Sequence, residues 1–143
     1  MPTRKAHARW EGDFNQGKGQ MEFGSGAFKG AYSAASRFED GPGTNPEELL
    51  GAAHAGCFSM ALTLALGQAG LKPQSVDTTA QVSIVPHQGG FKITKSHLIC
   101  EASVPGTDAA AFQKIAESAK KGCPVSQALA GVEITLEAKL VGR

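Results

Sequence analysis

Aromatic residues are scarce in this chain of 143 residues, which has one tryptophan, one tyrosine and seven phenylalanines. An excess of charge of either sign is also missing, because 14 lysines and arginines oppose 13 aspartates and glutamates. The basic residues are scattered and form no stripe or tail, so we expect no nucleic-acid partner. A hydrophobic content of 41% at this length is enough for one core, and we expect a single domain over residues 1–143.

The sequence also has little that would direct a chain to a membrane. Its start, MPTRKAHARWEGD, is basic but lacks the apolar segment of a signal peptide. No stretch reaches the roughly 18 unbroken apolar residues of a membrane span. The most apolar stretch, residues 51–67, is interrupted by His54, Ser59, Thr63 and two glycines. We therefore expect a cytoplasmic protein with no membrane partner.

Cysteine is rare, with Cys57, Cys100 and Cys123 only, and the sequence has no CxxC pair. An odd number of cysteines without a secretion signal argues against a disulfide framework. In a reducing compartment such cysteines are buried apolar residues, metal ligands or reactive thiols.

The glycine-rich residues 1–40 predict a small antiparallel meander. A long helix follows, because Asn45 is suited to cap its start, Pro46 to its first position, and Glu48 to the third residue of a capping box. Gly70 and the proline after it predict where this helix ends.

Beyond Gly70 the pattern alternates between strands and a helix. The second helix begins at a cap formed by Asp108 or Thr107 and ends before Gly122, with a short helical turn after it. The predicted strands are residues 76–85, 91–104 and 132–140, with a turn at HQGG between the first two. The expected class is α+β, with a mostly antiparallel sheet and a long buried central helix.

Residues 51–67 are apolar on nearly every side of the long helix. About 24 helical residues extend ~36 Å, close to the diameter of a domain of this size. A helix that is apolar all round must be buried all round, and the remaining elements are few for that purpose. We expect an intertwined homodimer in which this helix packs on the partner, the alternative being a buried central helix in a monomer.

The three cysteines differ in their expected surroundings. Cys100 shares a strand face with apolar residues and is expected to pack as a small hydrophobe. Cys123 precedes Pro124 at the start of a helical turn and lies two residues after Lys121, and both features should lower its pKa. Cys57 lies inside the helix and has no such help, so local chemistry favours Cys123 as the activated thiol.

His54 lies one turn before Cys57 on the same helix face. A zinc site of His54, Cys57 and Cys123 is one interpretation. Without a CxxC pair, a histidine that is hydrogen-bonded in the core or at an interface is the better one, and we expect no metal.

The segments SRFEDGPGTNPEELLGAAHAGCFSMAL and GCPVSQAL resemble the OsmC/Ohr family, and within it the osmotically inducible protein C branch. The resemblance extends over essentially the whole chain, including AHARWEGD, VDTTA and FKIT, and no motif position departs from it. It implies thiol-dependent reduction of hydroperoxides, with organic peroxides preferred, by an intertwined homodimer that has its long helices at the centre. No cofactor is expected.

The same resemblance assigns roles to four residues. Cys57 matches the peroxidatic cysteine, Cys123 the resolving cysteine, and Arg37 and Glu47 the activating pair. This assignment reverses the order of the two thiols that local chemistry favours. The implied reductant is a dithiol, which the family suggests is a dihydrolipoyl protein, with thioredoxin as the alternative.

The spacing of two of these residues predicts a composite site. Glu47 and Cys57 are ten residues apart on one predicted helix, or ~15 Å along its axis. If the helices of two subunits pair antiparallel, Glu47 of one, together with Arg37, approaches Cys57 of the other. We also expect an apolar pocket beside the thiol, lined by Phe58, Met60, Leu62 and Leu64.

Two other functions use the same residues. The protein would be a thiol redox sensor if its cysteines were oxidised once without turnover. It would be a binding protein for a small apolar ligand if its cysteines only packed.

Overall fold

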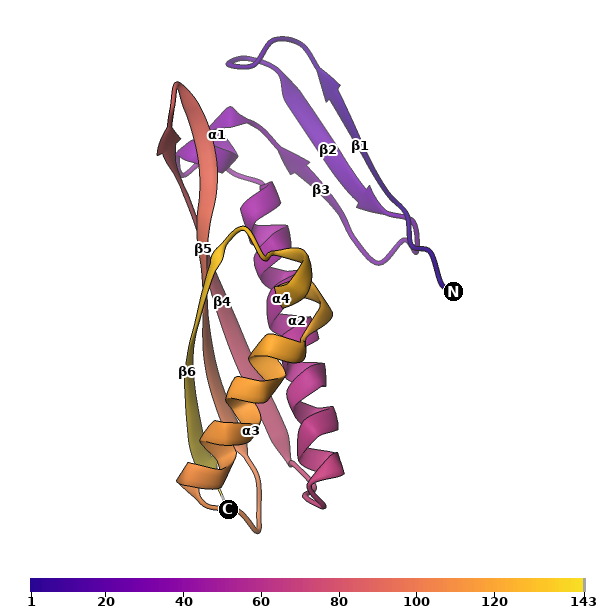
Figure 1. Cartoon of the computed structure of the whole chain (residues 1–143). Helices are drawn as coiled ribbons and strands as arrows, with labels where there is room; N and C mark the ends of the chain where they lie inside the picture. Colours follow the sequence, from indigo (N-terminus) through magenta and orange to yellow (C-terminus); the bar gives the residue numbers. More distant parts are fainter. Residues whose placement is uncertain (143) are drawn as a thin grey trace. The chain divides into compact units, whose positions relative to one another are not determined.

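A computed structural model of the protein describes residues 1–142 and confirms the α+β class (Figure 1). The chain forms two compact units, Met1–Leu49 and Leu50–Arg143. Each unit has its own three-stranded sheet. The single domain expected over the whole chain stays a prediction.

The first unit contains the predicted antiparallel meander. Its strands are β1 (Ala6–Glu11), β2 (Lys18–Phe23) and β3 (Lys29–Tyr32), in that order across the sheet. A short helix, α1 (Ala34–Phe38), follows the last strand and was not predicted. Its signal is a capping box of two serines: Ser36 N–H donates to the Ser33 hydroxyl, and Ser33 N–H donates to the Ser36 hydroxyl.

The long helix α2 (Pro46–Gln68) begins where the sequence predicts. The Asn45 side chain accepts a hydrogen bond from Glu48 N–H at 2.8 Å, which is the expected cap. The second half of the capping box is different, because the Glu48 carboxylate accepts from the Thr44 hydroxyl at 2.7 Å. After the helix Gly70 has a φ of +81°, a conformation that favours glycine and stops the helix.

The second unit contains β4 (Ser75–His87), β5 (Gly90–Ser103) and β6 (Glu133–Gly142), in that order. Gln88 and Gly89, both with positive φ, form the predicted turn between β4 and β5, which pair antiparallel. The β5–β6 pair is parallel, and two helices, α3 (Ala109–Gly122) and α4 (Pro124–Ala128), form the crossover connection that a parallel pair requires.

Two details of α3 bear on its predicted ends. The Asp108 side chain accepts from Ala111 N–H at 2.9 Å, which makes Asp108 rather than Thr107 the cap. Gly122 was expected past the end of this helix but lies inside it, since the Cys123 N–H still donates to the Ala119 carbonyl at 2.9 Å. The helix ends at Gly122, because Cys123 leaves the helical conformation and the nitrogen of Pro124 has no hydrogen to donate.

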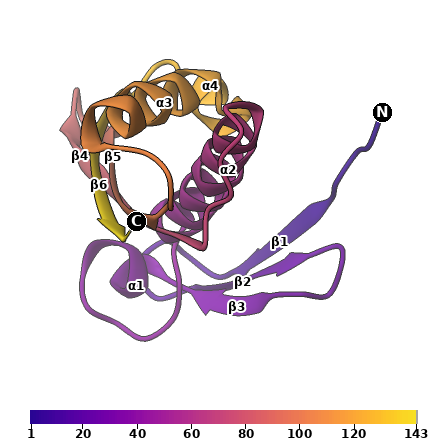
Figure 2. The ribbon, with the colours of Figure 1, turned by 90° about the horizontal axis from the view of Figure 1, so that it is seen from below.

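Helices α2 and α3 cover the same face of the β4–β5–β6 sheet (Figures 1 and 2). The core between them is formed by side chains from all three elements. Its largest fully buried apolar members are Phe58, Leu62, Leu66, Leu98, Val104 and Phe112. Each such side chain stabilises the fold by about 1.5–3 kcal/mol through the removal of apolar surface from water.

Burial of α2 within this chain is one-sided. Phe58 and Leu62 are fully buried, whereas Met60 is 77% and Leu64 is 64% exposed. The helix buried all round that the sequence predicts is therefore not formed by one chain. By length and composition α2 is also apolar enough to cross a membrane, which for one helix is weak evidence because core helices of soluble proteins meet the same criteria.

Candidate active site

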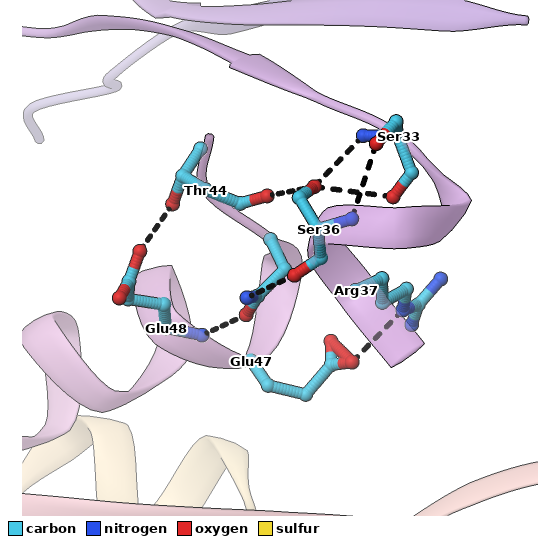
Figure 3. A network of polar contacts seen from close by, with 7 residues as sticks. Ser33, Ser36, Arg37, Thr44, Glu47 and Glu48 are labelled. Atoms are coloured by element: carbon cyan, nitrogen blue, oxygen red, sulfur yellow. Dashed lines mark hydrogen bonds and ion pairs between the residues drawn. The ribbon is translucent and has the colours of Figure 1, made fainter. Parts of the chain in front are cut away.

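Arg37 and Glu47, the predicted activating pair, form an ion pair in the first unit (Figure 3). Arg37 Nε donates to Glu47 Oε1 at 2.8 Å. The Glu47 side chain is 7% exposed and that of Arg37 is 33% exposed. A charge-assisted hydrogen bond of this length fixes the guanidinium while leaving its other nitrogens available.

The second carboxylate oxygen of Glu47, Oε2, is buried and has no hydrogen-bond partner within residues 1–142. A buried carboxylate oxygen without a partner is costly, at roughly 1–3 kcal/mol or more. This oxygen is therefore a point at which the pair can accept a further donor.

Local hydrogen bonds position Arg37 beside Glu47. The Ser36 hydroxyl donates to the Thr44 carbonyl at 2.7 Å, and the Asn45 amide donates to the Ser36 carbonyl at 3.0 Å (Figure 3). These bonds fasten the end of α1 to the residues just before α2. Of these residues the sequence singled out only Asn45, as a helix cap; Ser36 and Thr44 were missed, although small polar residues beside helix starts are their usual signal.

Cys57 and Cys123 are brought together in the second unit, 66 residues apart in the sequence. The Cys57 thiol hydrogen-bonds to Cys123, and both cysteines are free. Cys57 is half-buried on α2 and Cys123 is buried at the junction of α3 and α4. Cys100 is buried in the core on β5, as predicted.

The two thiols are held in different protonation environments. Burial raises the pKa of Cys57, and the hydrogen bond that its thiol gives to Cys123 raises the pKa further. Burial also acts to raise the pKa of Cys123, but hydrogen bonds from Cys57 and Ser126 bring it below its ordinary value. Within one chain Cys123 is the more acidic thiol, in agreement with the local sequence chemistry.

A groove of about 700 Å³ adjoins Cys57 between α2 and the α3–α4 junction. Met60 and Leu64 line it on the α2 side, and Ala119 and Pro124 line it opposite. Phe58 and Leu62 do not, so the expectation that they line the pocket is wrong. They lie on the opposite face of the helix and point into the core.

His54 is fully buried, and both of its ring nitrogens have partners. Nδ1 is 2.7 Å from the Ser96 hydroxyl and Nε2 is 2.8 Å from the Ser126 hydroxyl. Burial lowers its pKa from the ordinary value of 6.5. No group of three or more metal-ligating side chains suited to a metal ion occurs in residues 1–142.

An aromatic pocket of about 330 Å³ lies beside Arg37 in the first unit. The Arg37 guanidinium carbon is 5.4 Å from the centre of the Phe38 ring. The other aromatic lining residues are Trp10, Phe14 and Tyr32. Sequence reasoning did not predict this pocket, because its rings come from separate short segments whose pairing no local pattern specifies.

The comparisons with known proteins match between two thirds and nearly all of the chain. A family model described as OsmC-like protein matches residues 39–137. The chain is 54% identical over 138 residues to the Peroxiredoxin OsmC of Escherichia coli strain K12, with 96% of each chain covered. It is 39% identical over 98 residues to an organic hydroperoxide resistance protein of Xanthomonas axonopodis pv. citri, with 67% of each covered.

A solved structure has the same fold. The organic hydroperoxide resistance protein OhrB of Bacillus subtilis matches with a TM-score of 0.77 at 29% identity. The match covers 96% of this chain and 98% of that one.

Proposed function

This chain belongs to the OsmC-like protein family, and we propose that it reduces organic hydroperoxides to alcohols through Cys57 and Cys123. Relatives named as a peroxiredoxin and as organic hydroperoxide resistance proteins support a peroxidase role in oxidative or osmotic stress defence. The observation that carries the proposal is the contact between two free thiols, one of them beside an apolar groove. We place this activity in the cytoplasm.

The first step is a displacement on oxygen by the Cys57 thiolate. The sulfur attacks one peroxide oxygen, the O–O bond breaks, an S–O bond forms, and the alkoxide leaves to become an alcohol. Sulfur is oxidised by two electrons and the peroxide is reduced by two. The product on the protein is a Cys57 sulfenic acid.

The second step uses the neighbouring thiol. Cys123 attacks the sulfenic sulfur, the S–O bond breaks, and a Cys57–Cys123 disulfide forms with release of water. The contact between the two side chains supports this step without a large movement. A dithiol reductant, which we propose is a lipoyl protein or thioredoxin, then returns both cysteines to thiols.

Within one chain, burial and the hydrogen bond to Cys123 raise the pKa of Cys57 and so favour its protonated thiol. The first step therefore needs a cation beside Cys57 that stabilises the thiolate. A guanidinium is suited to this, since it stabilises a thiolate and the leaving alkoxide while it stays charged. We assign this role to Arg37, with Glu47 as the residue that orients it. Because the two residues form an ion pair in one chain, Arg37 and Glu47 would be supplied by the same subunit.

We propose that this pair comes from the partner of a homodimer. Ten residues of continuous helix separate Glu47 from Cys57, or ~15 Å. The exposed apolar side chains Met60 and Leu64 provide α2 with a face suited to a partner helix. Pairing there would complete the burial that one chain leaves unfinished.

The groove beside Cys57 supports a preference for organic peroxides over H2O2. Its lining includes Met60, Leu64 and Ala119, and each Å² of apolar ligand surface buried there contributes ~25 cal/mol. We expect a higher kcat/KM for cumene hydroperoxide than for H2O2. Equal values would contradict this assignment.

The proposal is tested by the thiol content of the purified protein before and after one equivalent of cumene hydroperoxide. We expect three free thiols to fall to one, with Cys57 linked to Cys123 and Cys100 free by peptide mass. Three intact thiols would contradict the peroxidase and favour a binding protein whose cysteines pack. A disulfide that no dithiol reduces would favour a redox sensor.

A further inference from the structure

A line of buried hydrogen bonds crosses the second unit and ends at Cys123. The Ser96 hydroxyl on β5 contacts His54 Nδ1 at 2.7 Å, and His54 Nε2 on α2 contacts the Ser126 hydroxyl on α4 at 2.8 Å. Ser126 lies three residues after Cys123 at the start of α4, and its hydroxyl and backbone N–H both act to lower the pKa of the Cys123 thiol. His54 is fully buried and both serines are nearly so, which shields these hydrogen bonds from bulk water.

The direction of these bonds follows from counting protons. A serine hydroxyl has one hydrogen, so Ser126 can donate to the Cys123 sulfur only if it does not donate to His54. The Ser126 oxygen must then accept from His54, which places the imidazole hydrogen on Nε2. The bare Nδ1 accepts the hydrogen of Ser96, and all the bonds point toward Cys123.

We propose that His54 is a positioning residue for the resolving step, holding the Ser126 hydroxyl so that it donates to the Cys123 thiolate. This inference rests on the proposed function and extends it, because it names a residue that acts through another. It also gives a reason for the burial of His54, which belongs to no group of three or more potential metal ligands in residues 1–142.

The step that benefits is the closure of the disulfide. The Cys123 thiolate attacks the Cys57 sulfenic sulfur, an S–S bond forms, and the S–O bond breaks. Cys123 is oxidised by one electron equivalent, the sulfenic sulfur is reduced by one, and the hydroxide that leaves is balanced by the proton that the Cys123 thiol gave up, so that water is released. The Cys57 thiol that stabilises Cys123 in the reduced protein no longer exists at that stage, whereas Ser126 and His54 are unchanged.

We call the line of hydrogen bonds from Ser96 through His54 to Ser126 the relay. The other groups near Cys123 do not replace it. From α2 the titratable neighbour is Cys57, while His54 contacts Ser126, and from α4 the backbone of Val125 acts on Cys123 besides Ser126. On α3, Lys120 pairs with Glu117 at 3.1 Å and Lys121 is exposed. On β5, Cys100 is hydrogen-bonded to Thr78.

The tautomer of His54 is measured without any variant. Nitrogen NMR of the histidine ring is expected to show a neutral imidazole with its hydrogen on Nε2 and none on Nδ1. A hydrogen on Nδ1 would overturn the proposal, because Ser126 would then have to donate to His54.

The pKa of Cys123 is measured by the pH dependence of its alkylation, in a protein carrying Cys57→Ser and Cys100→Ala. We expect His54→Leu to raise this pKa by about one unit, which is tenfold less thiolate at neutral pH, and His54→Gln to restore it through the amide hydrogen. Ser96→Ala should raise it by a smaller amount, and it provides the test if His54→Leu does not fold. An unchanged pKa in either folded variant would overturn the relay.

His97→Leu is the matched control, since His97 is hydrogen-bonded to Thr135 and Glu137 rather than to the relay. It should leave the pKa of Cys123 unchanged. In the Ser126→Ala background, His54→Leu should add no further rise, since it acts only through Ser126. No peroxide is used, so failure of disulfide formation would count against the proposed function and not against the relay.

Discussion

The two adjacent carboxylates at the start of α2 have different surroundings. Glu47 is buried and paired with Arg37, while Glu48 accepts from Thr44 and its N–H donates to Asn45. The capping pattern in the sequence predicts the role of Glu48, whereas the role of Glu47 is what the family resemblance implies. Glu47 belongs to the proposed chemistry, and Glu48 holds the helix start.

Glu47→Gln should therefore lower the peroxidase activity. Loss of a charged hydrogen-bond acceptor of roughly 1.5–3 kcal/mol releases Arg37, which corresponds to about 10- to 150-fold in kcat/KM for cumene hydroperoxide. Glu48→Gln is the matched control and should keep the activity. Activity lost in Glu48→Gln and kept in Glu47→Gln would reverse the assignment.

Cys123→Ser should separate the two steps of the reaction. Cys57 can still reduce one peroxide, but its sulfenic acid has no partner thiol to protect it. Intact mass after excess cumene hydroperoxide should show sulfinic and sulfonic acid on Cys57, whereas the unaltered protein shows a disulfide. Identical overoxidation of both proteins would mean that Cys123 does not resolve.

His54 should also make stability depend on pH. Burial lowers its pKa below 6.5, so the unfolded chain binds a proton that the folded chain does not. The free energy of unfolding should therefore fall as the pH drops below about 6.5, by at most ~1.4 kcal/mol per pH unit until the folded pKa is reached. Urea titrations from pH 7.5 to 5 should show a smaller decline in His54→Gln than in the unaltered protein, and an equal decline would contradict this prediction.

At the scale of elements, the sequence predicts where a helix starts or ends when one or two side chains determine that boundary. Asn45 and Asp108 cap α2 and α3 as the sequence indicates. The helix α1 was missed because its cap uses a serine in place of glutamate at the third position. The parallel pairing of β6 was not predicted, since a strand pattern contains no information about its neighbour's direction.

Asp108→Ala should reduce the stability of the second unit by about 1 kcal/mol, because Ala111 N–H loses its acceptor at the start of α3. Thr107→Ala is the control for the alternative cap and should change the free energy of unfolding by less than half as much. Urea denaturation followed by circular dichroism measures both. Equal losses would mean that the cap is shared.

At the scale of the whole molecule, the outer face of α2 is the feature that one chain leaves incomplete. Met60 and Leu64 are exposed there beside Cys57. The same face would serve the proposed dimer and the proposed site. A change of assembly should therefore also change activity.

Met60→Glu should convert a dimer into monomers at micromolar concentration, because a charge buried in the interface costs several kcal/mol. Peroxidase activity should be lost with it, since Arg37 and Glu47 of the partner would be absent. Val141→Glu, at an exposed apolar residue of β6, is the control and should change neither. Sedimentation velocity gives the assembly state, and a monomer before mutation would contradict the dimer.

By itself the sequence determined what depends on short-range chemistry. Caps, helix lengths, strand alternation and the burial of Cys100 follow from neighbouring residues and from periodicity. The sequence also indicated Cys123 as the more acidic thiol, although the largest cause that lowers its pKa, the hydrogen bond from Cys57, is a tertiary contact. The family resemblance added the roles of Cys57, Arg37 and Glu47, which stay predictions.

Only the tertiary structure decided which distant residues meet. The contact of Cys57 with Cys123 and the line from Ser96 through His54 to Ser126 join elements separated by dozens of residues. It also placed Phe58 and Leu62 in the core and Met60 and Leu64 outside. A helix that is apolar all round gives no amphipathic signal, so packing against the sheet alone selects its buried face.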